Sequence, residues 1–147
     1  MIIQQKTVCV VCFANYCRSP VAEVILKKSC NENVRIISAG LNPIARSGMD
    51  KRSHLYLKKR GYNISLHSPR KLSKQVIDNC DEVFAVDPII LMQMNKLFPS
   101  RTKKFKMLTF KDPSIILSDP FRFDDKAYNE VMENIEHVCL NLNIKSF

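Results

Sequence analysis

Residues 8–20 read Val-Cys-Val-Val-Cys-Phe-Ala-Asn-Tyr-Cys-Arg-Ser-Pro, and this stretch decides the fold. It begins within Thr7–Val11, a run of β-branched and small apolar side chains that is typical of a strand buried on both faces. A loop follows from Cys12 to Arg18. Ser19 is a favourable helix N-cap, and Pro20 is a favourable first helical residue. The stretch therefore predicts a buried strand, a short loop and the beginning of a helix.

The rest of the chain continues to alternate strands with helices. Further strands are predicted over Val34–Ala39, Glu82–Val86 and Phe105–Thr109. Helices are predicted from Ser19 to about Asn31, from the cap Asp50 to Arg60, from the cap Ser73 through Ile77, and over Ile89–Leu97 after the cap-plus-proline start Asp87-Pro88. A last helix is predicted through the apolar positions Tyr128, Val131, Met132, Ile135, Val138 and Cys139. Such alternation implies right-handed crossovers and a parallel sheet. We expect an α/β fold, in which a four-stranded parallel sheet carries helices on both faces and binds ligands at the carboxyl ends of its strands.

The length and composition are those of one globular domain. We expect the 147 residues to form a single domain, residues 1–147. No apolar run approaches the ~20 residues that a membrane-spanning helix needs, and the N-terminus lacks the basic-then-apolar order of a signal peptide. We therefore expect a cytoplasmic protein without a membrane partner, a monomer or weak dimer, whose six cysteines are mostly reduced.

The formal net charge is +9, with basic clusters at Lys51–Arg60, Arg70–Lys74 and Arg101–Lys106. The simplest interpretation of these clusters is solvated helix faces and loops. The functional alternatives are attraction of an anionic substrate or binding of nucleic acid. Only Tyr56 and Phe105 lie within the clusters, so the aromatic side chains that would support a nucleic-acid partner are scarce.

The loop after the first strand carries the residue types needed to bind and attack a phosphate. The thiolate is the nucleophilic form of cysteine, and loop N–H groups at a helix N-terminus stabilise an anion such as a Cys12 thiolate. The same N–H groups suit phosphate oxygens, and Arg18 can add a bidentate fork. Asn15 tolerates left-handed backbone and can tie a tight loop, while the Ser19 hydroxyl can hydrogen-bond the Cys12 sulfur.

Spacing alone leaves two other interpretations of this loop open. Cys12 could be a buried strand cysteine, with Arg18 paired to a carboxylate. Alternatively, Cys9, Cys12 and Cys17 could bind a metal, because Cys9 and Cys12 have C-x-x-C spacing. However, strand residues three apart face opposite sides, and no histidine or fourth cysteine lies nearby to complete a tetrahedral site. The phosphate interpretation is therefore favoured, with no metal and no cofactor.

The stretch Val11–Pro20 resembles the signature loop of the low-molecular-weight protein tyrosine phosphatases, V-C-x-G-N-x-C-R-S-P. Ile44, at a position where many bacterial members have leucine, indicates a resemblance to their bacterial type. Further matches follow in order along nearly the whole chain: Ser38-Ala39-Gly40, Gly48-Met49-Asp50, His67 with Arg70-Lys71-Leu72, Asp87, and Asp119-Pro120-Phe121. The signature loop and the late Asp-Pro together are highly specific for the family.

The resemblance implies a protein-tyrosine-phosphatase that hydrolyses phosphotyrosine through a cysteinyl-phosphate intermediate. Cys12 would be the nucleophile, Arg18 the phosphate clamp, and Asp119 first the general acid and then the base. Asn15 and Ser19 would support the loop and the thiolate, and Cys17 would be a redox partner that captures oxidised Cys12 as a disulfide. The phosphate-binding loop would comprise Cys12, Phe13, Ala14, Asn15, Tyr16, Cys17 and Arg18.

The surroundings of the loop carry further expectations. Ala14 replaces the family glycine, which would cost about 1 kcal/mol if the backbone there needs a positive φ. Asp112-Pro113 is similar to Asp119-Pro120, so only the resemblance selects Asp119. A wall is expected from Leu41–Ser47, and the residues expected to line the pocket are Phe13, Ile44, Phe121 and Arg122.

Other activities and partners on this fold are also weighed. A thioredoxin-coupled arsenate reductase needs cysteines just after the third strand, but Cys80 precedes that strand. Phosphoarginine phosphatases prefer a small threonine where Tyr16 stands. A non-catalytic phosphate-binding or nucleic-acid-binding module is the alternative of another class, against which the complete set Cys12, Arg18 and Asp119 argues. By analogy with the bacterial type, the partner is a phosphotyrosine-containing protein, such as a tyrosine kinase of exopolysaccharide synthesis.

Overall fold

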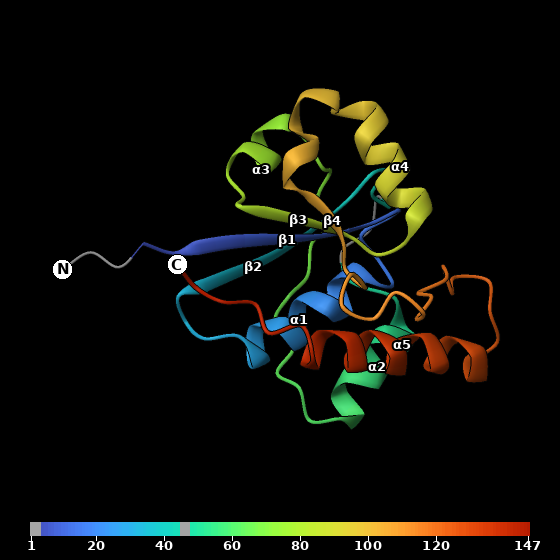
Figure 1. Cartoon of the computed structure of the whole chain (residues 1–147). Helices are drawn as coiled ribbons and strands as arrows, with labels where there is room; N and C mark the ends of the chain where they lie inside the picture. Colours follow the sequence, from blue (N-terminus) through green and yellow to red (C-terminus); the bar gives the residue numbers. More distant parts are fainter. Residues whose placement is uncertain (1–3, 45–47) are drawn as a thin grey trace.

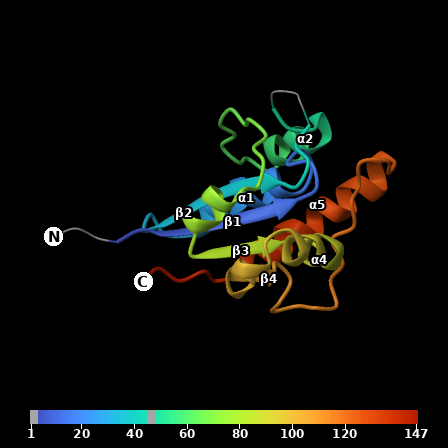
Figure 2. The same ribbon diagram turned by 90° about the horizontal axis from the view of Figure 1, so that it is seen from above.

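A four-stranded parallel sheet forms the centre of the computed structural model, which describes residues 4–44 and 48–147. Its strands are β1 (Lys6–Cys12), β2 (Val34–Gly40), β3 (Glu82–Ala85) and β4 (Phe105–Met107). They lie in the order β2-β1-β3-β4, with every neighbouring pair parallel (Figure 2). The predicted sheet is therefore confirmed.

Helices cover both faces of this sheet, as predicted. They are α1 (Ser19–Ser29), α2 (Lys51–Lys59), α3 (Lys74–Asp78), α4 (Pro88–Leu97), the 3-10 helix η1 (Pro99–Lys104) and α5 (Asp125–Leu140). Figure 1 shows α1, α2 and α5 on one side of the sheet, and α3 and α4 on the other. None of the helices in the described ranges has the length and apolar character required to cross a membrane.

The core is built around β1, because this strand has a neighbour on each edge and a layer of helices on each face. All four residues of Val8–Val11 are fully buried. Helix α1 packs against β1 and β2 through Val21, Ile25 and Leu26, and α5 packs against α1. The apolar run that predicted a strand buried on both faces is thus confirmed.

Polar side chains begin most of the helices. Asp50, Ser73 and Asp87 accept hydrogen bonds from the first-turn N–H groups of α2, α3 and α4, as the sequence predicts. The prediction that Ser19 is the N-cap of α1 is wrong: Arg18 holds that position, and Ser19 is already helical. The physical reason is that the Ser19 hydroxyl contacts the Cys12 sulfur instead of capping the backbone.

Most other element ends agree with the predictions to within one or two residues, and two differences need an explanation. Strand β4 ends at Met107 rather than Thr109, because the Phe110 N–H turns back and donates to the Met107 carbonyl at 3.1 Å. The 3-10 helix Pro99–Lys104 was not predicted, since a short 3-10 turn has no apolar period of its own. Neither difference changes the order of the strands.

The strand order places a binding crevice at one end of the sheet. β1 connects to β2 on one side, whereas β3, its other neighbour, connects onward to β4 on the opposite side. In open α/β sheets, ligands bind at such a switch point, outside the carboxyl ends of the strands. The loop that follows β1 and the residue Asp87 after β3 both lie at this end, which positions the site described next.

Candidate active site

The loop of residues 12–18, called here the Cys12 loop, has every carbonyl group tied away from its centre. The seven carbonyl oxygens accept hydrogen bonds of 2.8–3.2 Å, and the donors are in order Leu41 N, Asn42 N, Ile44 N, His67 Nε2, Asp50 N, Ser53 Oγ and Ala22 N. A carbonyl can only accept, so His67 carries its proton on Nε2. Segments distant in sequence thus fix the loop from outside.

The N–H groups of the same loop are left for a ligand. Across the described part of the chain, none of the six N–H groups from Phe13 to Arg18 donates to a protein acceptor. In a trans peptide the N–H points opposite to the carbonyl, and no peptide in the described ranges is cis. Carbonyls that point outward therefore turn these N–H groups inward, which makes a concave anion site.

The left-handed residue of this loop is Asn15, with φ 52°, and not Ala14. The concern that alanine in place of the family glycine strains the backbone is therefore removed. Glycine is required instead at Gly40, the last residue of β2. A Cβ atom there would lie 2.7 Å from the Asn15 nitrogen and 2.8 Å from the Phe13 carbonyl oxygen, closer than real Cβ contacts allow.

The Asn15 side chain is fully buried and uses its amide to join three segments. Its Nδ2 group donates to Ser19 Oγ at 2.8 Å and to Ser38 Oγ at 2.9 Å. Its Oδ1 atom accepts from the Arg70 N–H at 2.9 Å, and Ser38 in turn donates to Glu23 at 2.6 Å. These bonds hold the left-handed turn in place, as expected of a residue that supports the loop.

Cys12 lies at the floor of the site, with 3% of its surface exposed. Its sulfur is 3.0 Å from Ser19 Oγ. Because Asn15 already donates to that hydroxyl, the hydroxyl proton of Ser19 can point at the sulfur, which is nearer than its other acceptor, the Ala39 carbonyl at 3.5 Å. A hydrogen bond of this kind stabilises a thiolate more than a thiol.

Arg18 is also buried, and a carboxylate and a carbonyl fix its guanidinium group. Nη1 donates to Asp87 Oδ2 at 2.6 Å and to the Leu117 carbonyl at 2.7 Å. The pairing with a carboxylate, one of the interpretations left open above, is thus present, but it uses only Nη1. Among the described residues Nε and Nη2 have no protein acceptor, so they are available to an oxyanion in the pocket that Arg18 lines. Asp87 also caps α4 by accepting from Ile90 N at 2.8 Å.

A pocket of about 330 Å³ opens over the Cys12 loop. It is lined by Cys12, Phe13, Ala14, Cys17, Arg18, Asn42, Pro43, Ile44, Asp119 and Phe121. Three of the four expected wall residues are therefore present. Of the expected wall segment Leu41–Ser47, residues 45–47 lie outside the described residues.

Arg122 does not line this pocket, in contrast to the expectation. The Phe123 N–H donates to the Pro120 carbonyl at 2.9 Å and closes a turn. Arg122 is the third residue of that turn and is exposed to solvent. The turn therefore directs this side chain away from the site.

Asp119 and Asp112 occupy different environments, although each precedes a proline. Asp119 lines the pocket, and its Oδ1 atom accepts from the Phe121 N–H at 3.2 Å. Asp112 instead lies 3.7 Å from His137 of α5, remote from the pocket lining. Of these two carboxylates, only Asp119 shares a pocket with the Cys12 thiol.

Cys17 is the second thiol of the pocket. Burial raises the pKa of Cys17 to about 12, so it remains protonated near neutral pH. Its sulfur lies 3.8 Å from Asp50 Oδ2 and donates a weak hydrogen bond to it. Burial acts to raise the pKa of Asp50 as well, but hydrogen bonds from Arg52 outweigh burial and hold that pKa below its ordinary value.

The six cysteines are all free thiols. Within residues 4–44 and 48–147, no three side chains of histidine, cysteine, aspartate or glutamate gather as a metal site requires. The alternative of a metal held by Cys9, Cys12 and Cys17 therefore has no geometric support in this part of the chain.

Comparison with known families agrees with this geometry. The family model described as low molecular weight phosphotyrosine protein phosphatase matches residues 7–146. The chain belongs to this family. It is accordingly a protein-tyrosine-phosphatase, a hydrolase of phosphoric monoesters.

Relatives and solved structures of the family cover most of the chain. A probable low molecular weight protein-tyrosine-phosphatase, EpsP of Ralstonia nicotianae, is 28% identical over 89% of each chain. The human low molecular weight phosphotyrosine protein phosphatase is 27% identical over 91% of each chain. The crystal structure of a low molecular weight phosphotyrosine phosphatase from Vibrio cholerae superposes with a TM-score of 0.87 at 24% identity, covering 93% of this chain and 94% of that one.

An arginine phosphatase has the same fold. YwlE of Geobacillus stearothermophilus superposes with a TM-score of 0.85 at 25% identity, covering 93% of this chain and 90% of that one. The backbone alone therefore does not separate phosphotyrosine from phosphoarginine as substrate.

Sequence reasoning missed several supports of the site. Ser38 holds Asn15, Asp87 holds Arg18 in addition to capping α4, and Arg52 contacts the segment that follows Asp119. Ser38 offered a signal, because it is a polar residue within an apolar strand and such a residue needs a partner when buried. The contact of Asp87 with Arg18 and the contacts of Arg52 join residues that are far apart in the sequence, so no local sequence pattern predicts them.

Asp87→Asn tests whether the buried ion pair orients Arg18. Asparagine keeps an Oδ1 acceptor for Ile90 N, so α4 keeps its cap, but the charge that fixes Nη1 is lost. Hydrogen bonds to charged groups contribute about 1.5–3 kcal/mol, so we expect the inhibition constant of inorganic phosphate to rise at least about tenfold. Competitive inhibition of p-nitrophenyl phosphate hydrolysis measures it. Asp112→Asn is the matched control, and an unchanged inhibition constant in Asp87→Asn would contradict the assignment.

Proposed function

We propose that Cys12, Arg18 and Asp119 hydrolyse phosphotyrosine in two steps. In the first, the Cys12 thiolate attacks phosphorus, the bond from phosphorus to the phenolic oxygen breaks, and Asp119 gives its proton to that oxygen. In the second, Asp119 takes a proton from water, the water oxygen attacks phosphorus, and the phosphorus–sulfur bond breaks to release phosphate and the thiolate. Arg18 and the loop N–H groups hold the phosphate oxygens throughout.

One observation carries this proposal: all seven carbonyls of the Cys12 loop are bonded outward, while the N–H groups of residues 13–18 have no protein acceptor in the part of the chain that the structure describes. A module that only binds phosphate needs the cradle and the arginine. It needs neither a thiol at the floor of the cradle nor a carboxyl group in the same pocket. The presence of Cys12 and Asp119 together favours catalysis over simple binding.

The walls of the pocket favour an aromatic substrate. Phe13, Ile44 and Phe121 line it, and the ring of Tyr16 packs edge-on against Phe121 at 6.4 Å between ring centroids. Flat apolar walls around a phosphate cradle suit the phenyl ring of phosphotyrosine. Tyr16 also occupies the position where phosphoarginine phosphatases are expected to carry a small threonine.

The roles of the three residues are tested by three variants. Cys12→Ser is expected to lose activity on p-nitrophenyl phosphate altogether, because a serine hydroxyl does not ionise near neutral pH. The activity of Asp119→Asn on phosphotyrosine peptides is expected to fall on the order of 10²- to 10⁴-fold. The loss of activity should be smallest on aryl phosphates with good leaving groups. Asp112→Asn is the control and keeps full activity.

The wild-type protein decides the substrate class in the same assay. Phosphate release from phosphotyrosine peptides should far exceed release from phosphoarginine peptides. Faster hydrolysis of phosphoarginine would overturn the aromatic assignment, and a wild type without vanadate-sensitive phosphatase activity would overturn the mechanism.

We propose a phosphotyrosine-containing protein of the cytoplasm as the partner, in the first place a bacterial tyrosine kinase of exopolysaccharide synthesis. The support is the resemblance to bacterial family members, several of which are among the similar proteins. Cys12→Ser retains the cradle and Arg18 but cannot form the intermediate, so it should retain phosphoproteins. Phosphate or vanadate should elute the retained proteins, and mass spectrometry then identifies them. Retention of only serine- or threonine-phosphorylated proteins would contradict the proposal.

We propose that Cys17 protects Cys12 from irreversible oxidation. Peroxide converts the Cys12 thiolate to a sulfenic acid, and attack by the Cys17 sulfur then forms a disulfide and releases water. Both thiols line one pocket, which supports the pairing. After peroxide, peptide mapping should show Cys12 joined to Cys17, with activity restored by dithiothreitol. Cys17→Ser should lose that recovery, whereas Cys30→Ser keeps it; sulfinic acid at Cys12 of the wild type without any disulfide would refute the pairing.

A further inference from the structure

Residues 119–123, called here the acid segment, receive hydrogen bonds from one side chain of another element among the described residues, while the ring of Tyr16 packs edge-on against Phe121. Arg52 Nη2 donates to the Phe121 carbonyl and Arg52 Nη1 to the Phe123 carbonyl, each at 2.9 Å. The segment's other hydrogen bonds are internal to it. Across the described ranges of the chain, no other group outside the acid segment forms a hydrogen bond to it.

Arg52 is itself held rigidly. Its Nε and Nη2 groups donate to the two carboxylate oxygens of Asp50 at 3.1 and 3.2 Å. The guanidinium plane lies over the ring of Tyr128, a fully buried residue of α5, 3.9 Å from the ring centroid. Four of the five N–H donors of Arg52 are thus used, two on Asp50 and two on the acid segment. The planar fork of arginine provides this geometry, and a lysine ammonium does not.

The same turn of α2 that carries Arg52 also holds the Cys12 loop. The Asp50 N–H donates to the Tyr16 carbonyl at 3.0 Å, and Ser53 Oγ donates to the Cys17 carbonyl at 2.8 Å. Residues 50–53 therefore contact the nucleophile loop on one side and the acid segment on the other. The distance between nucleophile and acid is set through this turn.

We propose that Arg52 is a positioning residue that places Asp119 for proton transfer. The inference rests on the proposed role of Asp119 as general acid. Asp119 is exposed, and within residues 4–44 and 48–147 its one hydrogen bond is accepted from the Phe121 N–H of its own segment. Its position therefore follows the backbone of residues 119–123, and Arg52 fixes that backbone.

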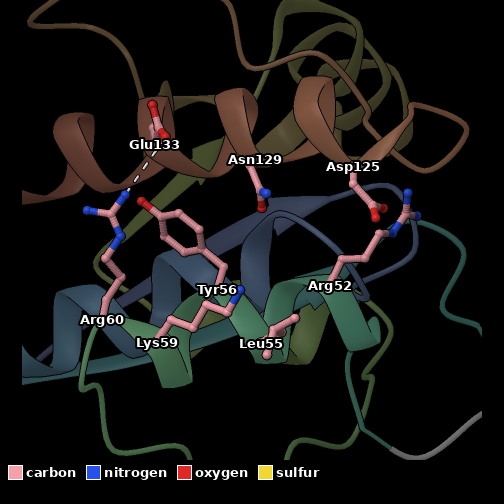
Figure 3. Close-up of a pocket in the computed structure, with 8 residues that line it drawn as sticks. All are labelled: Arg52, Leu55, Tyr56, Lys59, Arg60, Asp125, Asn129 and Glu133. Atoms are coloured by element: carbon pink, nitrogen blue, oxygen red, sulfur yellow. Dashed lines mark ion pairs between the residues drawn. The ribbon is translucent and has the colours of Figure 1, made fainter.

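The chain offers a matched control in Arg60, at the other end of α2. Figure 3 shows Arg52 and Arg60 at opposite ends of the groove between α2 and α5, which has a volume of about 290 Å³. Arg60 also stacks over a tyrosine, Tyr56, at 4.8 Å and pairs with Glu136 of α5 at 3.5 Å. Like Arg52 it combines a tyrosine ring with a carboxylate partner, but among the described residues it forms no hydrogen bond to the acid segment.

The test compares Arg52→Met with Arg60→Met on two aryl phosphates, in the wild type and in an Asp119→Asn background. Phenyl phosphate needs protonation of its leaving group, whereas dinitrophenyl phosphate does not. Misplacement by about 1 Å can cost on the order of 10²-fold. We therefore expect Arg52→Met to lower kcat/KM for phenyl phosphate on the order of 10- to 100-fold, with little change for dinitrophenyl phosphate. Arg60→Met should affect neither substrate.

The double variant separates positioning from general loss of structure. If Arg52 acts through Asp119, Arg52→Met adds little to the loss already caused by Asp119→Asn. If Arg52→Met does not fold, Arg52→Lys replaces it in the test, because lysine keeps the charge and the aliphatic stem. Arg52→Lys should show the same substrate selectivity with a smaller loss of kcat/KM. Equal losses on both substrates, full additivity with Asp119→Asn, or no loss at all would each overturn the proposal. If Asp119→Asn alone has no dependence on the leaving group, the assignment of the acid fails instead.

Discussion

The active site depends on one constraint, which is that each carbonyl of the Cys12 loop is satisfied by a donor outside the curve of the loop. Buried carbonyls need partners, and here the partners come from the segment after β2, from His67, from α2 with its N-cap, and from the first turn of α1. Because each peptide is planar, a carbonyl bonded outward turns its neighbouring N–H inward. The anion site is therefore a consequence of how distant segments pack around the loop, and the loop sequence alone does not create it.

That packing also gives individual residues roles that the local sequence does not indicate. The position where glycine was expected is occupied by Ala14, while Asn15 adopts the left-handed conformation and Gly40 provides the close approach. Similarly, Asp87 serves α4 with one carboxylate oxygen and Arg18 with the other. Removing one partner of a buried ion pair is costly because it leaves an uncompensated charge. The cap of α4 and Arg18, the proposed phosphate clamp, are therefore coupled through one carboxylate.

Much of this arrangement could be predicted from the sequence, since the deciding signals are local. The apolar run before Cys12, the strand–helix alternation and the caps Asp50 and Asp87 each follow from residues near one another in the chain. What escaped prediction consists of contacts across the fold, such as Ser38 with Asn15, or of residues that serve two roles. Ser19 illustrates the second case. A serine before proline predicts an N-cap, but Ser19 lies inside the helix and its hydroxyl contacts the Cys12 sulfur.

The proposed nucleophile Cys12 and the proposed acid Asp119 are held in unequal ways. The Cys12 loop receives a hydrogen bond on every carbonyl, whereas two bonds from Arg52 hold the acid segment from outside among the described residues. The difference suits the chemistry, because the cradle must keep one geometry for phosphate, while the carboxyl group must reach first a phenolic oxygen and then a water. An exposed carboxyl on a lightly anchored segment can serve both, provided that its backbone starts from a fixed place. The first turn of α2 supplies that fixed place because it contacts both parts at once.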